Sequence, residues 1–304
     1  MTMSYNTPII APVPREELER ELTPDKKIRD TNKAGNEIYI VTAADSPATM
    51  REIGRVREVS FRDAGGGTGL DCDIDAEDTA ENGYRQLIVW DPNAKEIIGG
   101  YRFIVCHSSY PEHLSTEHYF RFSDKFRREF LPYTIELGRS FIQPKYQSRG
   151  NNKSIYALDN LWDGLGALIN NHPEARYFFG KVTMYTDYHK EARNMLIYFM
   201  HRYFPDRDRL MEGINPVELN IDREYFDSIF NGESYDANYR ILIQKVRERN
   251  ENIPPLINSY ISLSPSMRVF PTVYNPDFGN VEETGILVTI ADIYPHKSQR
   301  HTQY

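Results

Sequence analysis

Apolar residues follow the period of a strand in some parts of the chain and the period of a helix in others. Short apolar runs bounded by turn residues predict strands at residues 38–42, 86–90, 97–106, 133–142, 175–185, 269–274 and 286–293. Apolar residues at spacings of three to five predict helices at residues 15–22, 46–62, 151–171, 188–203, 239–248 and 255–263. This mixture of strands and helices indicates an α/β fold with a mixed (α+β) sheet.

The regularity of the pattern divides the chain into three parts. Residues 1–36 are rich in proline and charge and lack a sustained apolar period, so we expect an N-terminal arm. Residues 37–210 carry the strand and helix alternation of a core, and residues 211–304 are expected to form a C-terminal extension packed on it. Within the core, residues 64–70 contain four glycines, which predicts a mobile loop.

Composition places the chain in the globular class and outside the disordered one. Of its 304 residues, 40% are hydrophobic and 26% are charged, and the mean hydropathy is -0.60. Apolar runs are only a few residues long, far short of the ~20 that cross a bilayer, and the N-terminus lacks the pattern of a secretory signal. Two cysteines, Cys72 and Cys106, are too few for a disulfide framework, so we expect a cytoplasmic protein.

Charge is unevenly distributed. The formal net charge of -8 argues against a dedicated nucleic-acid binder, which usually carries a strongly basic face. Residues 121–153 nevertheless carry a local charge of +5. Such a window suits an acidic partner, and a set of ordinary solvated side chains is the alternative.

Two charged residues stand in an apolar segment that is predicted to be a central strand. Glu136 and Arg139 would point to opposite faces of a regular strand, and a bulge near Gly138 would change their relative orientation. A splayed strand exposes backbone N–H groups that can bind a thioester carbonyl, while a carboxylate can take a proton from an attacking amine. A structural ion pair at the sheet edge is the alternative.

Two polar segments suggest further chemistry. The turn before the predicted helix 151–171 would place helix N-terminal N–H groups beside basic residues, an arrangement that binds phosphate, although a merely capped helix also fits. The aspartates of residues 71–78 have the spacing of a calcium loop. Ala76 and Asn82 occupy positions that such a loop needs for Gly and Glu, so a solvated acidic turn is the alternative.

Several motifs in a fixed order carry a family resemblance. They are Arg57 with Phe61, residues 73–78, residues 99–102, the Glu-Leu-Gly-Arg-Ser strand of residues 136–140 with Pro144 and Tyr146, residues 180–183, residues 253–256 and residues 277–279. Over about residues 45–293 the chain resembles the GNAT-superfamily N-acyltransferases that acylate ornithine or glycine in bacterial aminolipid synthesis, once labelled hemolysin-like. It is more distantly similar to acyl-homoserine-lactone synthases. Residues 180–183 and 185–188 favour the glycine branch, whereas Glu77 departs from the aromatic or apolar residue usual in the family.

The resemblance implies a GNAT-like fold and transfer of a 3-hydroxy or plain fatty acyl chain from an acyl carrier protein thioester to the α-amine of glycine or ornithine. It implies catalytic roles for Glu136, Arg139 and Arg102. It implies binding of the donor phosphopantetheine by Ser140, Gln147, Arg149, Gly150, Asn151 and Lys153. It implies an acceptor-side or ion-pair network of Arg57, Phe61, Asp73, Asp75, Asp78 and Thr183. No metal and no permanently bound cofactor are expected, because the acyl-phosphopantetheine thioester is a co-substrate.

Two alternatives remain. One is an acyltransferase that takes its acyl group from acyl-CoA and acts on another amine. The other is a non-catalytic acyl-carrier or lipid-binding module, which would keep the pocket without needing Glu136. For the main hypothesis the expected partners are acyl carrier protein and a small amino acid, with peripheral contact at the inner membrane as an addition and no nucleic acid.

Overall fold

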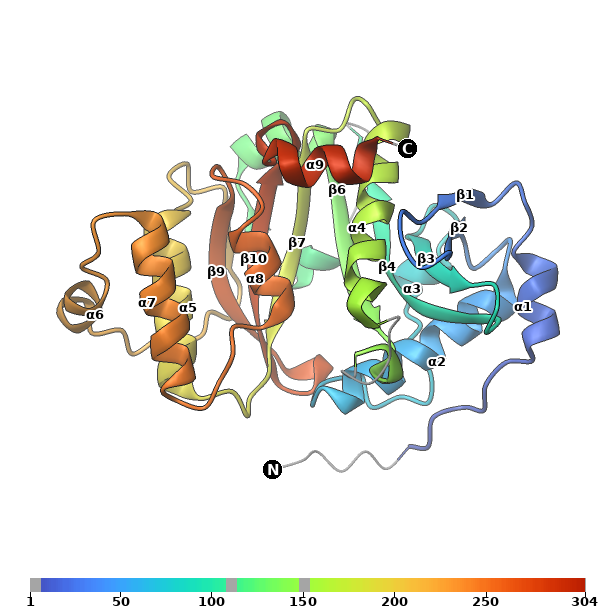
Figure 1. The fold of residues 1–304 in the computed structure, drawn as a ribbon, viewed down its shortest axis with the longest axis horizontal. Coiled ribbons are helices and arrows are strands. Elements are labelled where there is room, and N and C mark those ends of the chain that lie inside the picture. Colours follow the sequence, from blue (N-terminus) through green and yellow to red (C-terminus); the bar gives the residue numbers. More distant parts are fainter. Residues whose placement is uncertain (1–6, 108–113, 148–153, 304) are drawn as a thin grey trace.

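A single mixed sheet organises the chain (Figure 1). The computed structural model describes residues 7–107, 114–147 and 154–303. In these residues the sheet has eight strands, in the order β1 (Lys27–Asp30), β2 (Glu37–Val41), β3 (Arg85–Asp91), β4 (Glu96–Val105), β6 (Thr134–Ile142), β7 (Tyr177–Met184), β10 (Val281–Thr289) and β9 (Arg268–Asn275). Neighbouring strands are antiparallel except β6 and β7, which are parallel.

Helices cover both faces of this sheet. The described helices are α1 (Arg15–Glu21), α2 (Pro47–Asp63), α3 (Ala76–Thr79), α4 (Ser154–Asn171), α5 (Lys190–Tyr203), α6 (Arg223–Ile229), α7 (Tyr235–Arg247), α8 (Pro255–Ile261) and α9 (Pro295–Thr302). Helices α4, α5, α7 and α8 share one apolar core with the sheet, and α2 packs on the opposite face. A two-stranded sheet of β5 (Phe120–Phe122) and β8 (Met211–Gly213) covers the rest of that opposite face.

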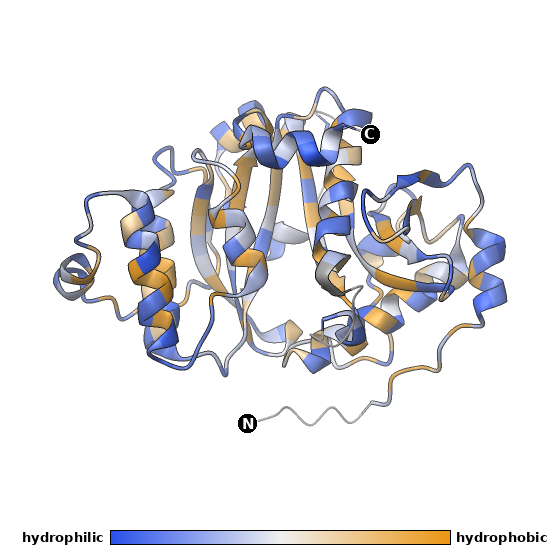
Figure 2. Cartoon of the chain, in the orientation of Figure 1, coloured by the Kyte–Doolittle hydropathy of each residue, from blue (hydrophilic) through white to orange (hydrophobic). Residues whose placement is uncertain are grey.

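The alternation of side chains along a strand explains why the central strands are almost continuously apolar. Leu87 and Val89 of β3 join the core beneath α4, whereas Ile88 and Trp90 join the core beneath α2. Because both faces are covered, apolar residues are required at nearly every position. Figure 2 shows the resulting concentration of apolar residues on the strands.

The structure confirms the mixed α/β fold, and the predicted strands and helices all occur with shifted ends. The expected arm contains the edge strand β1, which the pattern missed because Ile28 is its one apolar residue and backbone hydrogen bonds hold it to β2. The C-terminal part is more than a packed extension, since β9 and β10 continue the same sheet. Short elements α6, α9, β5 and β8 were also missed, because three to eight residues are too few to show a period.

The glycine-rich loop at residues 64–70, predicted to be mobile, is tied to α2. The buried carboxylate of Glu58 accepts hydrogen bonds from the backbone N–H groups of Thr68 and Gly69 and pairs with Arg62. These bonds hold the loop beside α2, and its mobility stays a prediction. Among the described residues, no helix combines the length and apolar character that crossing a bilayer requires.

Candidate active site

A bulge in β6 turns Arg139 toward the face of the sheet that carries Arg102. Gly100 lies opposite Phe141 and Arg102 lies opposite Gly138, so Arg139 and Ser140 together face the single residue between them on β4. Arg139 has a φ of 50°, in the left-handed region that few non-glycine residues adopt. The predicted bulge is therefore present, one residue beyond Gly138.

Strands β6 and β7 separate immediately before this bulge. Their parallel pairing covers only residues 134–136 and 177–179, whereas β7 continues to pair with β10 as far as Met184. At Gly180 the backbones of β6 and β7 still lie close together, because a Cβ atom at this position would lie 2.7 Å from the carbonyl oxygen of Leu137. Beyond this point the backbone groups of β6 that face β7 have no strand partner among the described residues, so the strands frame an opening.

Two cavities lie at this opening. The apolar cavity, of about 100 Å³, lies beneath α4 and is lined by Tyr101, Leu161 and Leu165 among others. The polar cavity, of about 460 Å³, is lined by charged and hydroxyl side chains. Both cavities are bordered by Leu137, Gly138, Arg139 and Lys181. Two ligands that enter from different sides can therefore meet at the bulge.

The carboxylate of Glu136 lies behind the polar cavity. Its side chain is fully buried and accepts hydrogen bonds from the hydroxyl groups of Tyr84 at 2.6 Å, Ser115 at 2.8 Å and Thr116 at 2.8 Å. Burial raises the pKa of Glu136, although the three donors oppose this shift. Ser115 and Thr116 line the polar cavity, whereas Glu136 does not. The two hydroxyl groups thus connect the carboxylate to the cavity.

Three acids of the segment 71–78 are wholly or partly buried and pair with guanidinium groups, so the alternative of a solvated turn is wrong for them. Asp73 and Asp78 are 1% and 2% exposed, and Asp75 caps α3 by accepting from the N–H of Asp78. Guanidinium groups reach all three acids, with Arg102 at 2.6 Å from Asp75 and Arg57 at 2.9 Å from Asp78.

Electrostatics inside this ion-pair network differ between the acids. Burial raises the pKa of Asp75, but the Arg102 guanidinium outweighs it and holds that pKa below its usual value. Burial dominates at Asp73 and raises its pKa, although Arg139 lies 3.4 Å away. Arg139 also lies 3.5 Å from Asp75, which joins the bulge of β6 to β4 through shared carboxylates. The network therefore fixes the wall of the polar cavity.

Sequence reasoning assigned no role to Lys181, the residue of β7 at the boundary between the cavities. Its ammonium group pairs with Glu283 of β10 and lies 4.6 Å from the centre of the Tyr119 ring. Burial lowers the pKa of Lys181, and Glu283 opposes that shift. The sequence did contain one indication that Lys181 is functional: it is a lysine within an apolar central strand, where an unpaired charge is costly.

The remaining predicted residues are distributed as follows. Phe61, Ser140 and Thr183 line the apolar cavity, and Phe61 packs edge to face on Phe278 at 4.9 Å. Gln147 is exposed and its side-chain amide donates to the carbonyl of Ile142. Arg149, Gly150, Asn151 and Lys153 lie outside the described residues. Within the described ranges, no group of three or more His, Cys, Asp and Glu side chains is arranged to hold a metal ion.

The basic window of residues 121–153 is largely neutralised where the structure describes it. Lys125 lies 2.7 Å from Asp208, and Lys145 pairs with Glu96. Arg127 lies 2.5 Å from Glu117. Acids from outside the window therefore offset part of its positive charge, which counting charges along the sequence omits, and docking of an acidic partner there stays a prediction.

Comparisons with known proteins agree with this geometry. A profile described as acetyltransferase (GNAT) domain matches residues 56–157, which include β4, β6 and the bulge. A glycine N(alpha)-acyltransferase of Phocaeicola vulgatus is 50% identical over 301 residues, covering 97% of this chain and 92% of the relative. A glycine N(alpha)-acyltransferase of Bacteroides thetaiotaomicron is also 50% identical over 301 residues, covering 97% of this chain and 89% of the relative. Two relatives are thus 50% identical to the chain over nearly its whole length, and the chain has strands that separate between two cavities. The chain therefore is an acyltransferase and belongs to the GNAT N-acyltransferase family.

Proposed function

We propose that this acyltransferase moves a fatty acyl chain from an acyl carrier protein thioester to the α-amine of glycine, as a step of bacterial aminolipid synthesis. The observation that carries the proposal is the meeting of an apolar and a polar cavity at residues 137–139. An acyl thioester suits the apolar side and an amino acid suits the polar side. The printed names of the two relatives support glycine as the acceptor.

The reaction needs a proton acceptor, and Glu136 is suited to that role through its hydroxyl neighbours. The neutral amine attacks the thioester carbonyl carbon, the carbon–sulfur bond breaks, and the departing thiolate takes up a proton from solvent, to which Glu136 later returns the proton that it accepts. The proton lost by the amine passes through the hydroxyl of Ser115 or Thr116 to the Glu136 carboxylate, which both already donate to. Backbone N–H groups of β6 that lie beyond its pairing with β7 would bind the developing oxyanion.

The acceptor's carboxylate also needs a positive charge, and Arg139 and Lys181 border the polar cavity. Arg139 is held by contacts of 3.4 and 3.5 Å, longer than an ordinary charged hydrogen bond. Its Nε–H has no hydrogen-bond partner in the described part of the chain. A guanidinium with a donor to spare is suited to bind a small carboxylate.

The donor's chain is proposed to carry a 3-hydroxyl group, and Tyr101 supports this. Tyr101 is 4% exposed and lines the apolar cavity, and its hydroxyl has no hydrogen-bond partner among the described residues. An unsatisfied buried hydroxyl costs about 1–3 kcal/mol. A hydroxyl on the acyl chain near the thioester would satisfy it. The reaction is proposed to occur in the cytoplasm, with peripheral contact at the inner membrane where the lipid product leaves.

The test is a reconstituted reaction with purified protein. Hexadecanoyl and 3-hydroxyhexadecanoyl thioesters, each on acyl carrier protein and on coenzyme A, are mixed with glycine, ornithine, alanine or serine. We expect thiol release and an N-acylglycine detected by mass spectrometry, fastest from 3-hydroxyhexadecanoyl carrier protein. Equal use of coenzyme A would refute the carrier protein as preferred donor. Thioester binding without thiol release for any amine would refute catalysis and favour a lipid-binding module.

A further inference from the structure

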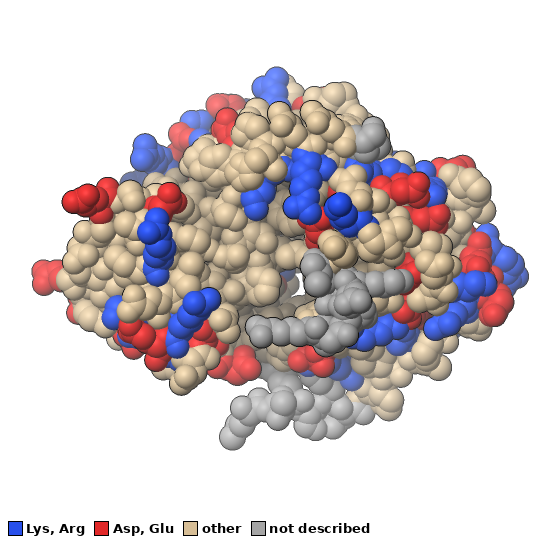
Figure 3. All heavy atoms as spheres, in the orientation of Figure 1, with Lys and Arg blue, Asp and Glu red and all other residues tan. Residues whose placement is uncertain are grey.

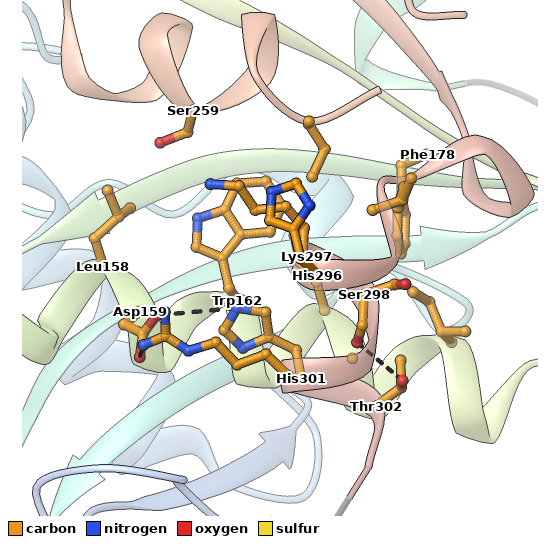
Figure 4. A pocket seen from close by; sticks show the side chains of 16 residues that line it. Leu158, Asp159, Trp162, Phe178, Ser259, His296, Lys297, Ser298, His301 and Thr302 are labelled. Atoms are coloured by element: carbon orange, nitrogen blue, oxygen red, sulfur yellow. Dashed lines mark hydrogen bonds and ion pairs between the residues drawn. The ribbon is translucent and has the colours of Figure 1, made fainter. Parts of the chain in front are cut away.

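A third cavity, of about 350 Å³, lies next to the apolar cavity, between α4 and the C-terminal helices (Figure 4). Leu158, Trp162 and Leu165 of α4 line both cavities, so the two share a wall. In Figure 4 the Trp162 ring lies centrally, between α4 and the segment that carries His296. We call the two cavities together the α4–α9 channel.

The shape and lining of the channel fit a hydrocarbon chain. Its lining along α4 extends from Leu158 to Ile169, a distance of about 16 Å at the rise of an α-helix. Phe178, Leu263 and Ile293 complete the apolar walls. Figure 3 shows a hollow with mainly uncharged walls on this face, and basic side chains gather along its α9 edge. The channel therefore has an apolar wall formed by α4, β7 and the segments around Leu263 and Ile293, and polar side chains of α4, α8 and α9 line its remaining side.

We propose that the α4–α9 channel binds the hydrocarbon part of the acyl donor, with the chain running along α4 toward α9. This inference rests on the proposed function, which puts the thioester carbonyl at the bulge. From that point a long chain must leave the reaction site, and the polar cavity on the other face is lined by ion pairs that would lose their solvation against it. On the apolar side, the α4 residues that line the apolar cavity continue into the lining of the third cavity, away from the bulge. Each methylene buried there raises affinity by about fourfold.

The far wall of the channel is anchored by contacts of α9 with α4 and with the N-terminal segment. Helix α9 packs directly on the α4 backbone, since a Cβ atom on Gly166 would lie 2.1 Å from the carbonyl oxygen of His301. The ring of His301 lies 2.7 Å from the Asp163 carboxylate of α4, and Arg29 donates to the carbonyl of His301 at 2.8 Å. The N-terminal segment and α9 thus fix the channel's width.

Chain-length preference tests the proposal. Ile169→Trp, which fills the far part of the channel, is expected to lower kcat/KM for hexadecanoyl thioester at least tenfold relative to octanoyl thioester, with octanoyl transfer retained. Asn171→Trp is the matched control, because Asn171 is exposed on the last turn of α4 and does not line the channel. An unchanged ratio, or equal loss of both substrates in a folded variant, would overturn the proposal.

Fluorescence separates this inference from the proposed function. The protein has two tryptophans, Trp90 in the α2 core and Trp162 in the channel. We expect hexadecanoyl-pantetheine to shift the emission of the wild type and of Trp90→Phe, but not of Trp162→Phe. A shift without turnover on any amine would support the channel and refute the acyl transfer. Turnover without a shift that depends on Trp162 would refute the channel.

Discussion

Replacing Glu136 by Gln removes the proposed proton acceptor while keeping its shape. Two of the three neighbouring hydroxyls, those of Tyr84 and Ser115, bind the same oxygen, Oε1, and would keep a carbonyl acceptor there. The Thr116 hydroxyl binds Oε2 and would turn to accept from the new amide. The variant should therefore fold as the wild type does.

The expected effects on stability and on turnover differ in size. One weakened charged hydrogen bond costs roughly 1–2 kcal/mol of unfolding free energy, and removing a buried ionisable group offsets part of it. Loss of a general base lowers kcat by about 10²–10⁴-fold, which is about 3–5 kcal/mol in the activation barrier. The kinetic effect should therefore exceed the change in stability.

The pH dependence follows from the direction of the shift. The pKa of Glu136 is raised in the folded protein, so the carboxyl stabilises the fold at pH below its ordinary value, and this contribution is lost as pH rises through the raised pKa. As a base, Glu136 becomes active over the same rise in pH. We expect the wild-type rate to increase across that interval and Glu136→Gln to lack the increase.

The assay measures thiol release from the acyl carrier protein thioester over a pH series, with urea unfolding of the same proteins. Glu52→Gln is the matched control, because Glu52 is a buried carboxylate of α2 that pairs with Arg55 and lines neither cavity. We expect this control to keep the wild-type pH profile. Turnover of Glu136→Gln within tenfold of the wild type, with its pH profile retained, would refute the reasoning.

Three further predictions concern the walls of the two cavities. In a double-mutant cycle, Asp75→Ala and Arg102→Ala should show a coupling energy of about 1–3 kcal/mol in urea unfolding, because each change removes the shortest ion-pair contact of the other residue within a largely buried network; additive losses would refute the pair. Tyr101→Phe should abolish the preference for 3-hydroxyhexadecanoyl over hexadecanoyl thioester in competition assays, and a retained preference would refute that contact. Lys181→Gln should raise the KM for glycine at least tenfold with little change in the KM for thioester. Because the pKa of Lys181 is lowered, the wild-type KM for glycine should rise at a lower pH than for an ordinary lysine, and a KM for glycine independent of pH would refute this.

Local patterns predicted the elements that are long and buried. The apolar face of α4 and the continuous apolar run of β3 are visible in one sequence, because burial of that face or run requires those residues. The edge strand β1 and the helix α9 were not visible. Backbone hydrogen bonds and contacts with distant residues hold them, and neither leaves a period.

Parts of the candidate site were also readable in the sequence. A carboxylate and a guanidinium around Gly138 in an apolar strand indicated a bulge, because two unpaired charges are too costly in a regular central strand. The hydroxyls of Ser115 and Thr116 were not indicated, since nothing in their local sequence places them against Glu136. Neither was the pairing of the basic window with acids such as Asp208.

The order of residues by itself therefore determined which segments become strands and helices, and where charge must enter the central sheet. The tertiary structure decided toward which face of the sheet the charged side chain of Arg139 points. The bulge turns Arg139 toward Asp75, the divergence of β6 and β7 opens the two cavities, and the packing of α9 on α4 closes the channel. These outcomes depend on contacts between residues far apart in the chain, and a local pattern records burial and period but not the partner.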